Sequence, residues 1–238
     1  LRQASLLIAT SHKNISSSDD IQVDCNAIAI PLGLDLEHYK MSAEMRASAR
    51  QWGRTLSGGR PIVAFVGRHA RYKGLDVLMN ALALDANLFG LIAGDGPYNA
   101  AMRAEATRLQ ITDRVMFLGS ISHVEKLRLL AAADIFAFPS TEKTEAYGIS
   151  QVEAMAMGLA VVATNLPTGV TDVSRHGETA IVVEPRNPAA FQEAISKLLS
   201  DDPLREKLAA SAYRNVSENL SNSLLVENTV AAIEQYAV

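Results

Sequence analysis

Short runs that are apolar at every position alternate along this chain with amphipathic helical patterns, and this alternation constrains the fold more than any other feature. Pro61–Val66 and Leu88–Ala93 are two of these runs, and neither shows the period of two that marks a half-buried strand. Strands are apolar throughout where helices cover both faces of a parallel sheet. The alternation therefore predicts an α/β fold with a doubly wound parallel sheet and right-handed crossovers.

The same pattern assigns a range to each element. Strands are expected at Ser5–Ala9, Ala27–Ile30, Pro61–Val66, Leu88–Ala93, Val115–Leu118, Ile135–Phe138, Ala160–Ala163 and Ala180–Val183. Helices are expected at Lys73–Leu84, Tyr98–Leu109, Val124–Ala133, Ile149–Met157 and Ala189–Leu199, and near Pro203–Asn219 and Ser223–Tyr236. No internal repeat or low-complexity segment interrupts the alternation.

Composition excludes several classes of protein. Of the 238 residues, 48% are hydrophobic and 20% are charged, as in an ordinary globular α/β protein with a sizeable core. The net charge of −4, without a basic stripe, predicts no nucleic-acid partner. The longest apolar run, around residues 154–163, is half of the roughly 20 residues that a membrane-spanning helix needs. Cys25 is the only cysteine, so an intrachain disulfide is excluded and a small buried thiol is expected.

Shifts in composition suggest where the chain divides. Residues 11–24 are polar and rich in serine, and a Ser-Gly-Gly-Arg stretch precedes the first strong strand. We interpret residues 1–30 as a stub of an earlier domain, 31–60 as a linker with a short helix, and 61–220 as one complete α/β domain. Because the chain begins at Leu1 rather than Met, we expect an upstream portion to be missing.

Open α/β sheets bind ligands at the carboxyl ends of their strands, so the loops that follow the strands are the informative ones. After the strand that ends at Val66, Gly67 permits a turn, and Arg68, Arg71 and Lys73 follow closely. Guanidinium and ammonium groups beside a helix start are suited to binding a diphosphate. A solvated basic loop is the alternative. The stretch matches neither GxGxxG nor GxxxxGK[ST], so dinucleotide and P-loop chemistry are not supported.

The later loops differ in what they offer. The glycine turn Ala93–Pro97 is expected to be structural, whereas Phe117–His123 offers backbone groups that could meet a flat base. Pro139–Gly148 is the longest of these loops, and it leads into the helix that carries Glu153.

Two glutamates, Glu145 and Glu153, stand with seven residues between them at the start of this helix. On one helix their backbones would lie roughly 12 Å apart along the axis, whereas a glycosidase needs its two carboxylates roughly 5–10 Å apart. The spacing favours two carboxylates that bind different hydroxyl groups of one extended ligand, with the N–H groups of Tyr147-Gly148-Ile149 near its phosphates. The alternative is a helix-terminal charge and a solvated glutamate.

The segment EAYGISQVEAMAMG, from Glu145 to Gly158, resembles the E-x7-E signature of retaining GT-B glycosyltransferases of the group 1 type, family 4. VGRHARYKGLDVLMNAL, LIAGDGP, VMFLGSIS, AAADIFAFPS and HGETAIVVEP are similar to other blocks of that family, in the same order. The resemblance covers about residues 1–200. It implies a Rossmann-like, donor-binding C-terminal half of a GT-B enzyme, with a helix at 221–238 that crosses back toward the first domain.

The resemblance also implies a reaction and residues for it. The donor would be a GDP- or UDP-linked sugar, with GDP-mannose favoured, transferred with retained anomeric configuration and without a metal or cofactor. By motif match, Arg68 and Lys73, beside Gly67, would hold the diphosphate and stabilise the departing nucleoside diphosphate. Glu153 would accept hydrogen bonds from the ribose hydroxyls, and Glu145 would contact the donor sugar. Arg68, Lys73 and Glu145 would be the catalytic residues.

Two further stretches would supply backbone contacts. The sugar and the distal phosphate would meet the backbone of Ala146, Tyr147, Gly148 and Ile149. The base would lie against the loop formed by Ser120, Ile121 and Ser122.

The chain departs from the family pattern at several places. Tyr147 stands where the family usually has phenylalanine, and Asn165–Val173 lacks the common Gly-Gly…Glu pattern, so no role is carried onto Asp172. His176 is expected to be structural. The acceptor-side domain is nearly absent, and with it the acceptor pocket and any catalytic histidine from that side. The acceptor, a glycan or a lipid-linked sugar, would be bound mainly by that missing domain.

Two functions from different classes remain open. The first is a glycosyltransferase of the hexosyltransferase type for surface polysaccharide or lipopolysaccharide, cytoplasmic or peripheral at the inner membrane through the missing domain, and inactive as this fragment. The second is a GT-B-like nucleotide-sugar-binding module without transferase activity. The presence of Arg68, Lys73, Glu145 and Glu153 favours the first.

Overall fold

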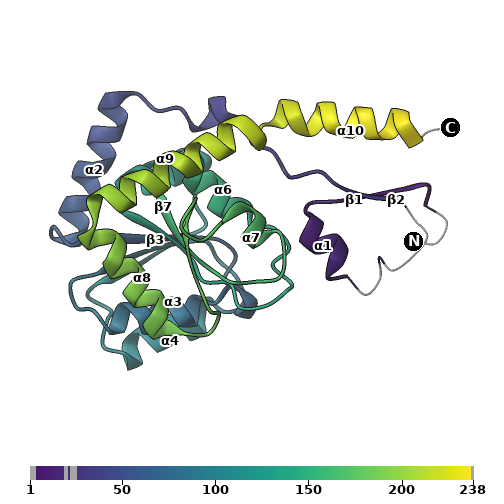
Figure 1. Cartoon of the computed structure of the whole chain (residues 1–238). Coiled ribbons are helices and arrows are strands. Elements are labelled where there is room, and N and C mark those ends of the chain that lie inside the picture. Colours follow the sequence, from purple (N-terminus) through teal and green to yellow (C-terminus); the bar gives the residue numbers. More distant parts are fainter. Residues whose placement is uncertain (1–3, 19–20, 22–25, 237–238) are drawn as a thin grey trace.

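The computed structural model describes residues 4–18, 21 and 26–236, so Cys25 lies outside the described residues (Figure 1). The main body is a six-stranded sheet in which neighbouring strands pair in parallel. In spatial order the strands are β5 (Val115–Gly119), β4 (Phe89–Ala93), β3 (Ile62–Val66), β6 (Ile135–Phe138), β7 (Ala160–Thr164) and β8 (Ile181–Val183). The predicted doubly wound parallel α/β sheet is confirmed.

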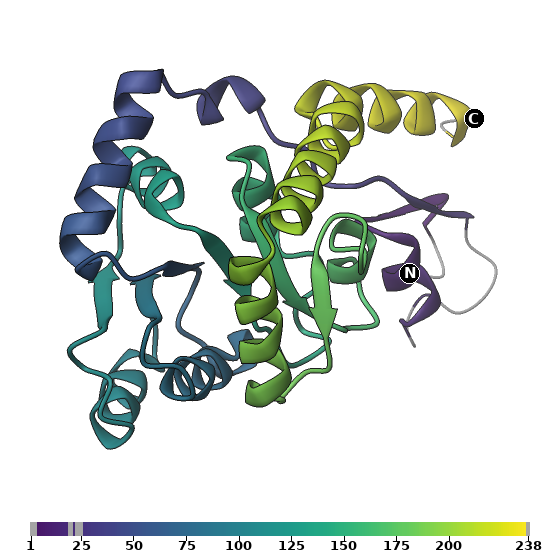
Figure 2. The same cartoon turned by 60° about the vertical axis from the view of Figure 1, so that its left-hand side comes forward.

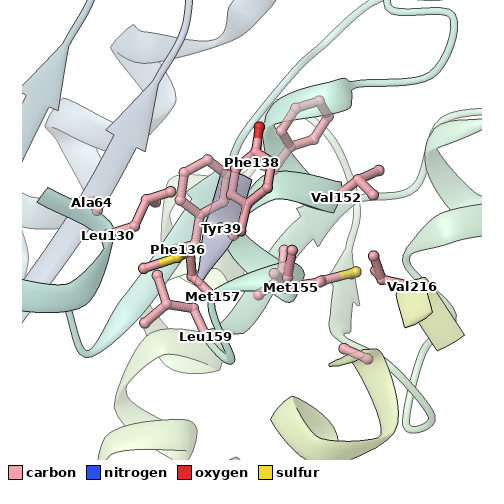
Figure 3. Close-up of a cluster of buried hydrophobic side chains, with 14 of the residues drawn as sticks. Tyr39, Ala64, Leu130, Phe136, Phe138, Val152, Met155, Met157, Leu159 and Val216 are labelled. Atoms are coloured by element: carbon pink, nitrogen blue, oxygen red, sulfur yellow. The ribbon is translucent and has the colours of Figure 1, made fainter. Parts of the chain in front are cut away.

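Successive residues of the central strands enter different clusters of buried side chains. In β3, Ala64 belongs to one cluster and Val63 to the other, and in β6 Phe136 and Ile135 divide in the same way. All four are fully buried, and Figure 3 shows part of the first cluster. A strand that is buried on both faces has no polar side, which explains the continuous apolar runs in the sequence.

Helices cover both faces of the sheet. One face packs against α2 (Ala43–Ser57), α5 (His123–Ala132) and α6 (Ile149–Ala156), and the other against α3 (Leu75–Ala83), α4 (Asn99–Arg108) and α8 (Pro188–Ser200). Figure 2 shows α8 continuing into α9 (Asp202–Asn219) and α10 (Asn222–Tyr236), the last of which extends beyond the body. Within the described part of the chain, no helix combines the length and the apolar character that crossing a membrane requires.

The segment before the main sheet forms a small unit of its own. β1 (Leu6–Ala9) and β2 (Asn26–Ala29) pair in parallel as a two-stranded sheet, and α1 (His12–Ser16) follows β1. Figure 1 shows this unit beside the body rather than within the six-stranded sheet. The division of the chain at residues 30, 60 and 220, and the course of the last helix toward another domain, remain predictions.

Residues 31–60 contain more structure than the short helix predicted for them. They hold the 3-10 helix η1 (Leu36–Tyr39) and then α2, which is 15 residues long. The Ser42 side chain accepts a hydrogen bond from the backbone N–H of Met45 at the start of α2, and Gly58 ends the helix in the left-handed conformation. Because α2 packs against α5, this segment is part of the body.

Two kinds of difference from the predicted elements have local causes. The helix expected from Lys73 begins instead at Leu75, because Gly74 has φ +65° and separates it from the 3-10 turn η2 (Arg71–Lys73). The short helices α1 and α7 (Val170–Val173) were not predicted. Neither is long enough to show a helical period in the sequence.

Candidate functional site

The strand order places two loops where the connections of the sheet change direction. β3 is the first strand of the sheet along the chain; β4 and β5 follow on one side of it, and β6, β7 and β8 follow on the other. The loops after β3 and β6 therefore leave the sheet in opposite directions, and open α/β sheets bind ligands in the crevice between such loops. These loops, residues 67–74 and 139–148, carry most of the residues predicted for the site.

The structure brings Lys73 and Glu145 together from these two loops. The Nζ atom of Lys73 lies 2.5 Å from Oε2 of Glu145, and the two side chains are only 13% and 8% exposed. The loops are held close, because the backbone N–H of Thr141 donates to the carbonyl of Tyr72 at 2.7 Å. Gly74 permits this approach, since a Cβ at that position would overlap the carbonyl oxygen of Pro139.

Glu145 is fixed by further hydrogen bonds. The hydroxyl of Ser140 donates to its Oε2 at 2.8 Å, and the hydroxyl of Thr168 donates to its backbone carbonyl at 2.8 Å. Its other carboxylate oxygen, Oε1, accepts no hydrogen bond from a described residue. Since α6 begins at Ile149, Glu145 precedes the helix, and the axial distance for two glutamates on one helix does not apply.

Glu153 lies within α6 and is bound by two donors from other elements. The hydroxyl of Tyr39 and the ammonium group of Lys126 both donate to its Oε1, at 2.7 Å and 2.5 Å. Burial, followed by the hydrogen bond to Glu153 and the charge of that carboxylate, raises the pKa of Tyr39, so its hydroxyl stays protonated and donating. The Oε2 atom of Glu153 accepts no hydrogen bond from a described residue.

The two glutamates thus share one arrangement. Each is almost buried, at 6% exposure for Glu145 and 9% for Glu153, and each is held through one oxygen by a lysine and a hydroxyl. The second oxygen of each carboxylate can accept a hydrogen bond from a ligand. Between them, the first N–H groups of α6 have no partner within the helix. The site can therefore bind hydroxyl groups at two points and an anion between them.

Gly148 determines how the chain enters α6. Its φ is +79°, and a Cβ there would lie 2.2 Å from the nearest ring carbon of Phe138, which is well inside contact distance. The preceding residue, Tyr147, is buried, and its hydroxyl donates to the carbonyl of Leu32 at 3.3 Å. This contact uses the hydroxyl group that distinguishes Tyr147 from the phenylalanine expected at this position. Ala146 and Ile149 are exposed on either side.

The side chains of the remaining predicted residues form no hydrogen bond or ion pair with Glu145 or Glu153 in the part of the chain that the structure describes. Arg68 is exposed, and its guanidinium group forms no hydrogen bond or ion pair with a described residue. Ser120 and Ile121 follow β5, and Ser122 caps α5 in a reciprocal pair of hydrogen bonds with Glu125. The side chain of Ser122 is therefore occupied by the cap. Neither observation tests the predicted contacts with phosphate or base.

Several residues of the site were not predicted. Ser140 is the second residue after β6, so the rule for carboxyl strand ends could have identified it. Lys126 lies one turn into α5, and Tyr39 lies in the segment that was interpreted as a linker. No local pattern marks either of them, because their relation to Glu153 exists only in the folded chain.

Helix α1 contacts the loop of residues 139–148, which follows β6. The side-chain amide of Asn14 donates to the carbonyl of Ala146 at 3.0 Å and accepts from the backbone N–H of Gly169 at 3.3 Å. Lys13 forms an ion pair with Asp172 at 3.4 Å. Asp172, to which the sequence carries no binding role, therefore has a partner within the protein.

Two histidines differ in their surroundings. Nδ1 of His176 lies 3.1 Å from the backbone N of Val182 and 3.0 Å from its carbonyl oxygen, which fits the structural role expected for it. His69 is fully buried between the rings of Phe65 and Phe117, and neither of its ring nitrogens has a hydrogen-bond partner. Burial lowers the pKa of His69.

No group of three or more His, Cys, Asp or Glu side chains that could hold a metal ion occurs among the residues that the structure describes.

Comparison with known proteins identifies the family. Residues 49–215 match the family described as glycosyl transferases group 1. D-rhamnosyltransferase WbpZ of Pseudomonas aeruginosa is 32% identical over 213 residues, which cover 89% of this chain and 54% of the relative. O-antigen chain mannosyltransferase C of Escherichia coli is 24% identical over 228 residues, which cover 95% of this chain and 60% of the relative. The chain thus spans a little over half of the length of these relatives.

A solved structure shows the same fold. The crystal structure of Anabaena Alr3699/HepE in complex with UDP and glucose matches with a TM-score of 0.87 and 25% sequence identity, over 97% of this chain and 63% of that chain. The six-stranded parallel sheet and its flanking helices are therefore those of a GT-B glycosyltransferase structure. By sequence and by fold, this chain belongs to the family of group 1 glycosyl transferases.

Proposed function

We propose that this chain is the donor-binding half of a retaining glycosyltransferase, of the family 4 type with an E-x7-E motif, that transfers a sugar from a nucleotide-sugar to an acceptor. The observation that carries the proposal is the pair of nearly buried glutamates at the crevice, each with one oxygen held by the protein and the other able to accept a hydrogen bond. Two such acceptors flanking a helix start suit a ligand with hydroxyl groups at both ends and phosphates between them.

Lys73 supplies positive charge for the diphosphate in this proposal. An ammonium group has three donors, and the contact with Glu145 uses one of them. The other donors can bind phosphate oxygens, together with the N–H groups at the start of α6 and the guanidinium of Arg68. Charge that develops on the departing nucleoside diphosphate would be stabilised by the same groups, which is the largest contribution this domain can make to the reaction.

Glu145 and Glu153 have different partners on the donor. Glu145 stands beside Lys73, and in the proposal its Oε1 binds a hydroxyl of the sugar that is transferred. The ammonium of Lys73 offsets the charge of Glu145, so that an anionic diphosphate can approach this carboxylate. Glu153 binds the ribose through its Oε2, next to the Ser120–Ser122 loop that would meet the base.

The donor we propose is GDP-linked, with GDP-mannose favoured over a UDP-sugar, and the product is a surface polysaccharide or lipopolysaccharide. A relative named O-antigen chain mannosyltransferase supports the sugar and the product, whereas the related Anabaena structure contains UDP. A panel of GDP, UDP and their sugar conjugates, titrated calorimetrically against the chain, identifies the base.

Separate substitutions of the two glutamates test the proposed roles. Glu153→Gln should weaken binding of nucleoside diphosphate and nucleotide-sugar alike, each by about 1–3 kcal/mol, because both ligands contain ribose. Glu145→Gln should weaken binding of the nucleotide-sugar only. If Glu145→Gln loses nucleoside diphosphate as severely as Glu153→Gln does, the two glutamates do not bind opposite ends of the donor.

A further inference from the structure

Two side chains outside α6 converge on a single oxygen of Glu153. Oε1 of Glu153 accepts from the hydroxyl of Tyr39, which belongs to η1, and from the ammonium of Lys126, which belongs to α5. The Nζ atom of Lys126 also lies 5.8 Å from the centre of the Tyr39 ring. Three groups from three elements therefore form one compact cluster.

Burial makes this cluster stiff. The side chains of Lys126 and Glu153 are 19% and 12% exposed, and Tyr39 as a whole is 7% exposed. The ring of His123 packs edge-on against Tyr39, with 5.4 Å between ring centres, and its Nε2 lies 2.9 Å from the carbonyl oxygen of His38. Figure 3 shows Tyr39 among the core side chains of the first cluster. The hydroxyl of Tyr39 therefore has little freedom to leave Glu153.

Such a cluster fixes the position of the second oxygen of Glu153. A carboxylate is planar, so once Oε1 is held by two donors the direction of Oε2 is set as well. An acceptor with a fixed direction binds a hydroxyl without first losing rotational freedom, and this preorganisation increases affinity and selectivity. Lys126 also supplies the positive charge that a carboxylate at 12% exposure needs to remain favourable there.

We propose that Tyr39 and Lys126 are positioning residues that act through Glu153 and make the site select ribonucleotides over deoxyribonucleotides. The inference rests on the proposed function, since it takes the ribose to be the ligand of Glu153. Neither residue touches the ribose in this account. A structural role alone, in which the two residues only attach η1 and α5 to α6, makes a different forecast.

The test is a selectivity ratio rather than an affinity. GDP and UDP, with their 2′-deoxy and 3′-deoxy counterparts, are titrated calorimetrically against the chain. We expect the wild type to bind the ribonucleotide about 10-fold or more tightly than at least one deoxy counterpart, the value of a hydrogen bond to a charged group. Glu153→Gln should bring this ratio close to 1, and Tyr39→Phe and Lys126→Met should each lower it several-fold.

Matched controls and a rescue separate positioning from stability. Tyr236→Phe on α10 and Lys207→Met on α9 change the same residue types on other elements and should leave the ratio unchanged. Lys126→Arg keeps the positive charge and should restore part of the ratio. Tyr39→Phe keeps the buried ring, so its folding can be verified by thermal melting.

The outcomes distinguish this inference from the proposed function. If Tyr39→Phe and Lys126→Met weaken ribo- and deoxyribonucleotides equally and keep the ratio, the two residues are structural and the inference is wrong. If the wild type binds nucleoside diphosphates with a ratio near 1, Glu153 does not read the ribose and the inference is likewise wrong, while nucleotide binding stands. If the wild type binds no nucleoside diphosphate, the proposed function fails and the inference with it.

Discussion

Lys73 has two tasks in the proposed site, because it compensates the charge of Glu145 and offers donors to a diphosphate. Its ion pair is nearly buried, with the two side chains 13% and 8% exposed. Removing one partner of such a pair leaves the other charge without compensation, which is more costly than exchanging both for neutral groups. A single substitution at Lys73 therefore changes folding and binding together.

For Lys73→Ala we expect two effects of separate origin. Nucleoside diphosphate affinity should fall by about 1.5–3 kcal/mol, the value of a hydrogen bond to a charged group. The free energy of unfolding should fall by about 3 kcal/mol, because Glu145 remains buried and unpaired. Calorimetric titration measures the first and urea denaturation the second.

The double variant Lys73→Met with Glu145→Gln separates these effects. It removes both charges and keeps an acceptor for the hydroxyl of Ser140, so stability should return toward that of the wild type. Affinity for nucleoside diphosphate should stay low. If affinity is unchanged in both variants, Lys73 does not bind the diphosphate.

His69 provides a prediction about pH. Burial lowers its pKa in the folded chain, whereas a histidine in the unfolded chain has a pKa of about 6.5. The unfolded state therefore binds more protons as the pH falls through this range, and His69 makes the fold less stable in mild acid. His69→Leu should remove this loss and two unsatisfied ring nitrogens, with a gain of about 1–3 kcal/mol.

Urea denaturation at about pH 7.5 and about pH 5.5 tests this sign. The free energy by which His69→Leu is more stable than the wild type should be larger at the lower pH. A difference that is independent of pH would mean that folding does not lower the pKa of His69.

At the scale of single elements, the entry into α6 is the most constrained feature. Gly148 and Gly158, at the two ends of this helical stretch, both have φ +79°. A Cβ at position 148 would collide with the ring of Phe138, whereas a Cβ at position 158 would meet no atom within 4 Å. The two glycines therefore share the cost of left-handed backbone and differ only in the space available.

This difference gives a matched pair of substitutions. Gly158→Ala should reduce the free energy of unfolding by about 1–2 kcal/mol, the cost of the left-handed conformation for a residue with a Cβ. Gly148→Ala should cost more, because Phe138 must also move, and it should weaken nucleotide-sugar binding at the start of α6. Urea denaturation of both variants measures the difference, and equal losses would show that the ring of Phe138 yields freely.

The elements that the sequence predicts well are those with a long period or a continuous apolar run. The strands of the main sheet and most of the helices that cover it follow from these patterns, within a few residues at their ends. Helix α1 lies in a serine-rich stretch with no apolar period, and its place depends on contacts such as that of Asn14 with the Ala146 carbonyl. Contacts of this kind leave no trace in local sequence.

At the scale of the whole molecule, the two glutamates differ in how far the sequence predicts their partners. Lys73 and Glu145 lie 72 positions apart, yet the rule for carboxyl strand ends places both at one crevice. Tyr39 and Glu153 lie 114 positions apart, and no such rule connects them. Tyr39 precedes the main sheet, and its position depends on how the chain wraps around α5 and α6. This half of the site required the structure.

The length of the chain leads to a prediction about activity. It covers 54% of the rhamnosyltransferase relative, and the proposed function assigns acceptor binding to a domain other than this donor-binding half. We expect residues 1–238 to bind donor weakly and to transfer no sugar to a glycan or lipid-linked acceptor, whereas the full-length protein transfers it. A radiolabelled-sugar assay of both proteins tests this, and robust turnover by residues 1–238 alone would contradict it.

The hydrogen bond between Tyr39 and Glu153 also connects the proposed ligand site to the segment that leads from β2 into α2. At Leu34 this segment is pinned to the junction of α9 and α10 by backbone hydrogen bonds with Leu220 and Asn222, of 2.8 Å and 3.0 Å. Thermodynamic reciprocity then applies: if the segment stiffens Glu153 for its ligand, the ligand stiffens the segment by an equal free energy. Binding of a nucleotide at Glu153 should therefore stiffen this segment, and slower amide hydrogen exchange at residues 36–40 upon addition of GDP would register it.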